Sequence, residues 1–521
     1  MIRRILTVGG LTLLSRISGF ARDILLAAVL GAGPVADAFF VALRLPNHFR
    51  AIFAEGAFNA AFVPAYAQIR EQGGAARAGL FADRVFTLLL ASQVILLALA
   101  LVFMPQVVGL LAPGFNEDPG RFAIAVDLTR ITFPYLLLIT LVTLYGGILN
   151  SLHRFAAAAA APILLNLSMI VALMLVAFFP DAGHAAAWGV FAAGILEVLL
   201  LLADVTRAGA LPVLRWPQFD ADVRRFFKAL GPATIGSAGV QLALFADTVI
   251  ASFLATGALS ALYYADRINQ LPIGVIGIAI GTVILPEMAR RIAAGDERGA
   301  AHAQNRALEF ALLLALPCVV AFLLVPELIM RALFARGAFT SADAVAAGQT
   351  LAAYALGLIP FVLIRSAVAT FFARGDTATP VKASLSAAAV NILFKVLLMG
   401  SLAQVGLALA TAIGAWTNLL LVLWLAARRG LLVVDARLRR SLGRLLIAAT
   451  ALAVLLVLLP RPLATMLAGR PFHDELTLAI LAVAGGVVYG GAIILLFGRG
   501  WLRAFGAGKG SVDRTPDPPT V

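Results

Sequence analysis

Apolar residues dominate the chain in long runs, which alternate with short segments that contain proline, glycine or charged side chains. An α-helix needs about 20 consecutive apolar residues to cross the hydrocarbon core of a bilayer. Dividing the sequence by this length, with boundaries at Pro, Gly and charge clusters, predicts an all-α polytopic membrane protein with fourteen transmembrane helices. The predicted spans are 5–30, 36–66, 80–104, 122–150, 160–179, 185–206, 228–255, 259–289, 305–325, 344–372, 381–400, 404–427, 440–459 and 475–497.

Composition agrees with this pattern and excludes other classes. Of the 521 residues, 62% are hydrophobic and only 13% are charged, which is too apolar for a soluble protein. The net charge of +13 could suggest a nucleic-acid partner, but most Lys and Arg residues lie in short loops between apolar runs. Positive charge in such loops sets membrane orientation instead, so we expect no nucleic-acid binding. Cys318 is the only cysteine, which excludes a disulfide framework and a cysteine metal cluster.

Loop charge predicts the orientation of the spans. Of the 40 Lys and Arg residues, 27 fall on the side that the N-terminus shares, eight fall within spans, and five fall on the opposite side. The positive-inside rule therefore places both termini in the cytoplasm. The five residues on the outer side are Arg121, Arg331, Arg336, Arg461 and Arg470.

The stretch from 11 to 66 carries charges that membrane helices normally exclude. An ionisable side chain near the bilayer centre costs roughly 2.5–3.5 kcal/mol on insertion scales, so several arginines need water, a counter-ion or an anionic ligand. We therefore expect these side chains to line an interior. They are Arg16, Arg22, Asp23, Asp37, Arg44, Arg50 and Glu55.

The chain repeats itself at a period of roughly 220 residues, the length of six spans. ARDILLAAVLGAG (21–33) matches FADTVIASFLATG (245–257), and Gly114-Phe115 matches Ala338-Phe339. Because six is even, the two halves share one orientation and should be related by an axis along the membrane normal, with the substrate site between them. The alternative is that any two Ala/Leu-rich membrane helices look alike. The predicted divisions are an N-terminal lobe (1–210), a C-terminal lobe (211–430), helices 13 and 14 (431–500) and a disordered cytoplasmic tail (501–521).

The repeat is asymmetric in charge. When Asp23 is aligned with Asp247, Arg22 stands opposite Ala246, and the second half contributes mainly Asp266-Arg267. The sequence therefore predicts an asymmetric, positively charged central cavity.

Several of these segments resemble the MurJ (MviN) lipid II flippases of the MOP exporter superfamily. The resemblance covers nearly the whole chain, although the last two spans match only in position and hydropathy. It implies two six-helix lobes around a V-shaped cavity, two extra C-terminal helices, and alternating-access translocation of lipid II from the cytoplasmic to the periplasmic leaflet of the bacterial inner membrane. The segments that carry it are SRISGFARD (15–23), GAGPVADAFFVALRLPNHFR (31–50), IFAEGAFNAAFVP (52–64), YYADRINQLP (263–272) and GTVILP (281–286).

The side-chain chemistry suits such a substrate independently. Lipid II presents a diphosphate, and the planar fork of arginine binds phosphate in bidentate fashion and stays ionised when partly buried. The aspartates would hold the empty cavity together and exchange partners when the anion arrives. Arg44 has the alternative of a local pair or of snorkelling to the interface. The candidate transport residues are Arg16, Arg22, Asp23, Asp37, Arg44, Arg50, Ser260 and Arg267.

Two isolated charges in the second half form a separate candidate. Asp247 and Lys395 fall at similar depth in apolar spans, where opposite charges are usually paired or bound to an ion. Asn391 and Thr411 could complete a charge-pair or cation site. We expect the lysine ammonium to stand in for a cation, which predicts transport that does not depend on sodium. The alternative is a static structural pair.

The last predicted span carries Gly485, Gly486, Gly490 and Gly491, a surface of small residues that lets a helix or a lipid chain approach closely. Helix packing and a groove for the polyprenyl tail are both open interpretations. The groove predicts that bulky residues at Gly486 and Gly490 impair transport of a long-chain lipid more than that of a short-chain analogue.

Other function classes fit less well. The five histidines are scattered and no paired carboxylates stand in a loop suited to group transfer, which argues against an enzyme and against a metal or other cofactor. An exporter of another lipid-linked oligosaccharide or a small-molecule antiporter of the same superfamily remains the alternative function. A scaffold role would not require intramembrane arginines. The expected partners are lipid II, membrane lipids and the cell-wall synthesis machinery, and we expect a monomer.

Overall fold

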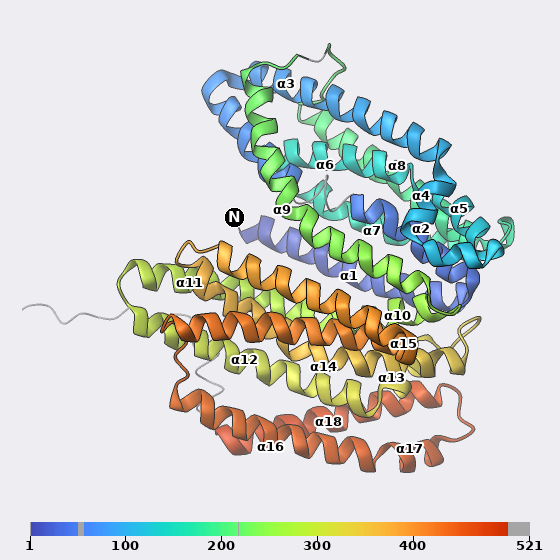
Figure 1. Cartoon of the computed structure of the whole chain (residues 1–521), viewed down its shortest axis with the longest axis vertical. Coiled ribbons are helices and arrows are strands. Elements are labelled where there is room, and N and C mark those ends of the chain that lie inside the picture. The colour runs from blue at the N-terminus through green and yellow to red at the C-terminus, as the bar shows by residue number, and fades with distance from the viewer. Residues whose placement is uncertain (1, 50–56, 217, 499–521) are drawn as a thin grey trace, which may run out of the picture. The chain divides into compact units, whose positions relative to one another are not determined.

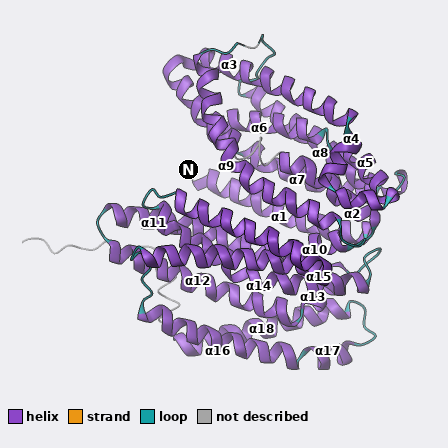
Figure 2. Ribbon diagram, viewed as in Figure 1, coloured by secondary structure: helices purple, strands orange, loops and turns teal. Residues whose placement is uncertain are grey.

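The computed structural model describes residues 2–49, 57–216 and 218–498, and in this part of the chain all regular structure is helical (Figure 2). Ten of the described helical segments are long and apolar enough to cross a membrane. The chain is therefore an all-α polytopic membrane protein, whereas the predicted number of fourteen spans stays a prediction. The predicted tail (501–521) lies outside the described residues.

Packing divides the chain into two compact units. The first contains residues 1–266, 333–350 and 388–410, and the second contains 267–332, 351–387 and 411–521. This division crosses the predicted boundary at residue 210, because α9 packs against α3 within the first unit. The four predicted divisions therefore remain predictions.

In the first unit, α1 packs on α7, α7 on α8, α2 on α5, and α3 on both α6 and α9 (Figure 1). Its helices are α1 (Ile2–Leu30), α2 (Pro34–Phe49), α3 (Ala57–Val102), α4 (Met104–Leu111), α5 (Pro119–Thr132), α6 (Tyr135–Ser151), α7 (Ala156–Met174), α8 (Ala182–Arg207) and α9 (Ala221–Ser252), with 3₁₀ turns at Pro113–Glu117 and Val176–Phe178.

The second predicted span, 36–66, stays a prediction because it includes residues outside the described part of the chain. Helix α2, described up to Phe49, covers its first part, and residues 57–66 form the start of α3. The polar segment 67–79, predicted as a loop, is helical except at Gly74, whose φ of 75° is accessible mainly to glycine. Its Ala, Arg, Glu and Gln residues favour helix, so local propensity extends α3 where hydropathy alone suggested a break.

In the second unit, α11 packs on α12, α12 on α16, and α18 on both α16 and α17. Helix α10 (Ala258–Pro272) begins in the first unit and continues into the second through a π-helical turn at Ile273–Gly277. The remaining helices are α11 (Ile278–Ala293), α12 (Glu297–Leu324), α13 (Pro326–Phe334), α14 (Ser341–Phe372), α15 (Ala378–Arg428), α16 (Ala436–Leu458), α17 (Pro460–Leu467) and α18 (His473–Phe497).

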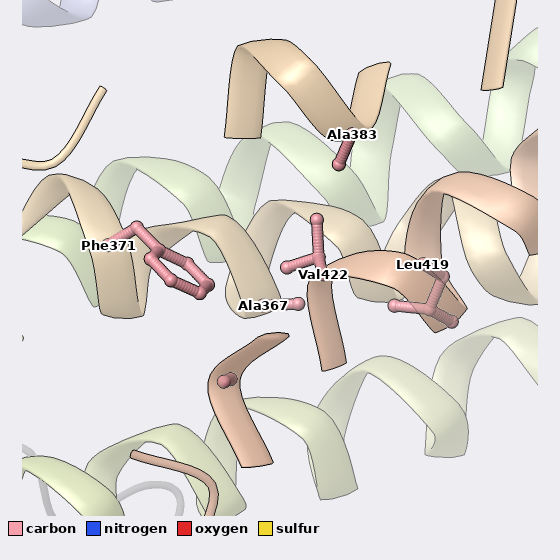
Figure 3. Packing of buried hydrophobic residues seen from close by; sticks show 6 residues of the cluster. Ala367, Phe371, Ala383, Leu419 and Val422 are labelled. Carbon is pink, nitrogen blue, oxygen red and sulfur yellow. The ribbon is translucent and has the colours of Figure 1, made fainter. Parts of the chain in front are cut away.

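Helix α15 contains two of the predicted spans. Its backbone leaves the helical region at Ala403 (φ 45°, ψ −128°), between the predicted spans 381–400 and 404–427. The chain folds back closely here, because a Cβ on Gly406 would lie 2.6 Å from the carbonyl oxygen of Leu398. Both ends of α15 pack on α14 in the second unit, where Phe371 and Ala367 meet Ala383, Leu419 and Val422 (Figure 3).

Hydrogen bonds and ion pairs connect the C-terminal helices α16 and α18 to α12. Asp435 caps α16 and accepts two hydrogen bonds from Arg306 Nη2, at 2.8 and 2.7 Å. The fully buried Glu309 pairs with Arg306 and accepts a hydrogen bond from Ser441. Further along, Tyr489 donates to the carbonyl of Leu313 at 2.8 Å. Helices α16 to α18 are thus anchored at two levels.

Candidate functional site

Arg22 lies inside a hydrogen-bonded network in the first unit. Its Nε and Nη2 atoms donate to Asp23 Oδ1 at 3.1 and 2.7 Å, and its Nη1 donates to Asn166 Oδ1 at 3.0 Å. Tyr263 donates its hydroxyl to the same Asp23 oxygen at 3.2 Å, and its ring stacks on Phe40. Arg22 is only 8% exposed and Asp23 only 4%, so each charge is neutralised by the other inside the protein.

Asn166 contacts both the side chain of Arg22 and the helix α1 to which Arg22 belongs. Its Nδ2 donates to the carbonyl of Ser15 at 2.9 Å and to Ser18 Oγ at 3.0 Å. A Cβ on Gly19 would lie 3.3 Å from the same nitrogen, so the absence of a side chain at Gly19 leaves room for this amide. The guanidinium of Arg22 is therefore held by Asn166 of α7 as well as by Asp23, the next residue in its own helix.

Arg16 has a different environment although it shares a helical stripe with Asp23. Its side chain is exposed, and it has no hydrogen bond or ion pair within the described parts of the chain. Arg50, the fourth predicted arginine of this stretch, lies outside the described residues.

Asp37 caps the start of α10 from another helix. Its Oδ2 accepts from the backbone N–H of Gly257 at 2.7 Å, and its Oδ1 accepts from the N–H and the hydroxyl of Ser260 at 3.0 and 2.7 Å. Unpaired N–H groups and the helix dipole make a helix N-terminus favourable for a negative charge. The fully buried carboxylate of Asp37 is therefore satisfied by the first turn of α10, and the structure brings the two candidates Asp37 and Ser260 together.

Arg121 caps the end of α9 and faces Asp37. Its Nη1 and Nη2 atoms donate to the carbonyls of Leu254 and Ser252, each at 3.5 Å, and its Nη1 lies 3.6 Å from Asp37 Oδ2. The guanidinium also lies over the ring of Phe115, 4.1 Å from its centroid. One ion pair thus joins a cap on the C-terminal end of α9 to a cap on the N-terminal end of α10.

Two loops cover the ends of α1 and α9 in a way that follows the repeat. Gly114 donates its N–H to Ser252 Oγ at 3.0 Å, and Ala338 donates its N–H to the carbonyl of Ala28 at 2.7 Å. Ser252 is the repeat equivalent of Ala28, as Ala338 is of Gly114. Gly337 has φ of +60°, and a Cβ there would lie 2.2 Å from the carbonyl oxygen of Ala28, so only glycine fits. At these ends of α1, α2, α9 and α10, direct hydrogen bonds therefore join each helix to another helix or to a loop. The residues that form them include Ala28, Asp37, Ser252 and Ser260.

A second buried ion pair lies in the same unit. Lys395 Nζ, with its side chain 3% exposed, donates to Asp247 Oδ1. Next to Asp247, Thr248 accepts a hydrogen bond from Arg44 Nη1 at 3.4 Å, so Arg44 of α2 contacts a residue of α9 that is 204 positions away in sequence. The structure brings Asp247 and Lys395 together as the sequence predicts.

The remaining candidates lie elsewhere. Asn391, one turn before Lys395, has a buried Oδ1 without a hydrogen bond in the described structure. Thr411 and the half-buried Arg267 belong to the second unit. A cavity shared by Arg267 with Arg16 and Arg22 stays a prediction.

In the second unit, an apolar cavity of about 360 Å³ lies between α12, α16 and α18. Gly485 and Gly486 both line it, with different roles. A Cβ on Gly485 would approach Leu452 to 2.9 Å, whereas a Cβ on Gly486 would meet no atom within 4 Å. Gly485 therefore allows α18 to pack closely against α16, whereas the absence of a side chain at Gly486 leaves a groove. Gly490 and Gly491 have open space beside them but do not line this cavity.

Sequence reasoning missed three residues of these networks. Arg121 was noted only as one of five outer cations, although a rare cation on that side is a signal for a specific partner. Tyr263 stands in the motif YYADR without a charge, and Asn166 stands in an apolar span. An asparagine in a membrane helix is costly without a partner, so Asn166 was detectable in principle.

Comparison with known proteins agrees with this architecture. A solved structure described as lipid II flippase MurJ in an inward closed conformation superposes with a TM-score of 0.79, at 24% identity over 95% of this chain and 99% of that chain. An inward-facing MATE family multidrug resistance transporter of the MOP superfamily superposes with a TM-score of 0.65, at 14% identity over 82% and 98%. The chain therefore shares the fold of these two solved proteins.

The sequence comparisons are more specific. The family described as lipid II flippase MurJ matches residues 26–469. A probable lipid II flippase MurJ of Rhizobium tropici is 42% identical over 88% of this chain and 87% of its own length, and one of Rhizobium meliloti (strain 1021) is 41% identical over 99% of both. The chain belongs to the MurJ lipid II flippase family.

Proposed function

We propose that this protein translocates lipid II from the cytoplasmic to the periplasmic leaflet of the bacterial inner membrane by alternating access. Membership of the MurJ family supports the substrate. The observation that carries the mechanism is the buried guanidinium of Arg22, held on two sides by Asp23 and Asn166 inside a membrane protein. A fixed fork of this kind is organised to bind a phosphate group in bidentate fashion.

The contacts at the helix ends support a state of the transport cycle in which the periplasmic side is closed. If the N-terminus is cytoplasmic, α1 runs outward, and the contacts of Asp37, Arg121 and the two loops lie at the periplasmic end. They then form a periplasmic gate that is closed in this structure. Because both Asp37 and Arg121 act through helix ends, separating α9 and α10 from α2 and α5 would break several hydrogen bonds together, which favours two discrete states.

The cation-rich cavity would bind the diphosphate while the gate is closed. Asp23 holds Arg22 in the absence of substrate, and an arriving phosphate would compete with this carboxylate for the guanidinium. Arg16 is exposed and would be available to the same anion. In the proposed mechanism, this exchange of partners links substrate binding to movement of α1.

Reconstitution provides the direct test. The purified full chain is incorporated into liposomes containing lipid II, and translocated headgroup is measured by its accessibility to an added impermeant reagent. We expect headgroup translocation well above that of protein-free liposomes. An absence of lipid II movement, combined with uptake of an organic cation against a proton or sodium gradient, would favour the small-molecule antiporter instead.

The Asp247–Lys395 pair gives a prediction about stability and coupling. Removing one partner of an ion pair costs about 3 kcal/mol when the other charge stays buried, and the loss is expected to be smaller here because the side chain of Asp247 is 28% exposed. Lys395→Ala is therefore expected to reduce folded protein and transport, and the double variant with Asp247→Ala is expected to recover part of the loss. Thermal stability in detergent and translocation with and without sodium measure both effects. The proposed role of the pair would be contradicted if the double variant were no more stable or active than Lys395→Ala. It would also be contradicted if transport by the wild type depended on sodium.

The groove gives a prediction about the lipid tail. We propose that the apolar cavity beside Gly486 accommodates part of the polyprenyl chain. Gly486→Leu is expected to fit without a clash, fill this cavity and slow transport of long-chain lipid II at least several-fold more than that of a short-chain analogue. The sequence prediction grouped Gly490 with Gly486, but Gly490 does not line the cavity. Gly490→Leu therefore adds the same side chain outside the cavity and is the matched control. Equal impairment of both substrates would assign the glycines to packing alone.

A further inference from the structure

A second cavity of the second unit has a different chemical character. It has a volume of about 670 Å³ and lies where the end of α12 and the start of α13 meet α17 and α18. Its charged lining consists of Glu327, Arg331, Arg461 and Asp474. These two cations and two carboxylates give the cavity no net charge.

Only one pair of these charges is joined. Arg331 lies against Asp474, with Nε 3.3 Å from Oδ2 and Nη2 3.5 Å from Oδ1. The buried Nε of Arg331 still has no hydrogen-bond partner in the described structure. Arg461 and Glu327 line the same cavity, but neither forms an ion pair with the other or with any other described residue. The cavity thus presents one cation and one carboxylate that are both available to a ligand.

The rest of the lining is apolar and partly uncovered. Leu323 and Leu324, at the end of the membrane-spanning helix α12, are 38% and 41% exposed. Ala464 of α17 faces the same space. A ligand that uses both surfaces needs a charged end and a hydrocarbon end, at the depth where a transmembrane helix leaves the bilayer.

We propose that this cavity binds the headgroup of a zwitterionic phospholipid of the phosphatidylethanolamine class. The phosphate would contact Arg461 and the guanidinium of Arg331, and the ammonium would contact Glu327. The first carbons of an acyl chain would cover Leu323 and Leu324. An anionic headgroup suits the site less well, since it would face Glu327 and Asp474 without a cation of its own.

The proposal does not rest on lipid II transport, because it concerns a lipid retained at rest. It assigns the short helix α17 and the outer arginines Arg331 and Arg461 a role in holding a membrane lipid against the C-terminal helices. Arg331 and Arg461 are two of the five cations that the sequence places on the outer side.

Lipid binding to the delipidated full chain in detergent tests it. Native mass spectrometry follows titration with phosphatidylethanolamine, phosphatidylglycerol and phosphatidylcholine of identical acyl chains. We expect phosphatidylethanolamine to bind most tightly. Arg461→Gln and Glu327→Gln should each weaken its binding about tenfold, the size of one charge-assisted hydrogen bond. Arg470→Gln and Glu117→Gln remove the same charges away from the cavity and should leave binding unchanged.

Further arms separate the possible ligands. Glycerophosphoethanolamine and inorganic phosphate carry the phosphate without the chains, and neither should displace the bound lipid at comparable concentration. Displacement by either would identify a site for a soluble phosphate and overturn the lipid assignment. Equal binding of the three lipids, or equal binding by wild type and both cavity variants, would equally refute the proposal. Gln variants that elute as monodisperse protein and keep wild-type thermal stability exclude misfolding as the cause of weakened binding.

Discussion

Arg22→Ala is expected to reduce lipid II translocation to the background of empty liposomes and also to lower the thermal stability of the protein. The guanidinium donates two hydrogen bonds to Asp23 and one to Asn166, and all three are lost together. Removing a charge-assisted contact to a phosphate costs about 1.5–3 kcal/mol, or roughly ten- to a hundredfold in rate. Arg22→Lys should restore only part of the activity, because a single ammonium cannot reproduce the fork.

Arg16→Ala separates substrate binding from folding in the same assay. Arg16 is exposed and without a described partner, so its loss should abolish translocation with little change in stability. Arg130→Ala is the matched control, since it removes an exposed arginine of the same unit whose single ion pair in the described structure is with Asp127. Normal transport by Arg16→Ala and Arg22→Ala at equal expression would overturn the cationic-cavity mechanism. Arg50→Ala and Arg267→Ala are also expected to abolish translocation.

Asn166→Leu tests the same network while leaving Arg22 itself in place. The amide donates to Ser15 and Ser18 and accepts from Arg22, so leucine would leave the guanidinium held from one side only. We expect reduced transport with a raised apparent lipid II requirement, and partial rescue by Asn166→Gln. Unchanged transport would reduce Asn166 to a packing residue.

The Asp37→Asn variant is expected to open the proposed periplasmic gate. The carboxylate accepts three hydrogen bonds, and an amide nitrogen in place of one oxygen would oppose the N–H of Gly257 or Ser260. A buried N–H left unsatisfied costs about 1–3 kcal/mol, which shifts a two-state equilibrium by about tenfold or more. A cysteine at Ala258, 5% exposed beside the cap, reports the change through its labelling by an impermeant maleimide in a Cys318→Ser background.

Labelling at position 258 should rise about tenfold in the Asp37→Asn variant, and translocation should fall. Asp118→Asn is the matched control: Asp118 lies near the same arginine, 4.0 Å from Arg121 Nε, but its side chain is 48% exposed. It should leave labelling nearly unchanged. Identical labelling of wild type and Asp37→Asn would show that the cap on α10 is structural and does not gate the protein.

Hydrophobic pattern alone was sufficient to predict the all-α membrane class and the positions of most of the described helices. This succeeded because the bilayer imposes one length on every span and makes each ionisable residue within a span a conspicuous exception. The depth argument also identified Asp247 and Lys395, since two opposite charges at one level of an apolar bundle have few alternatives to each other. The pattern failed between 67 and 79, where helix propensity continues α3 through a polar segment that bends at Gly74.

The partners of the charged residues were decided only by the tertiary structure. Asp37 and Ser260 are 223 residues apart, and nothing local shows that one caps the helix containing the other. Arg22 and Asn166 lie on different helices, as do Arg121 and the carbonyls at the end of α9. Sequence determines that such groups must be satisfied, because burying them unpaired is costly, but only packing determines which groups satisfy them.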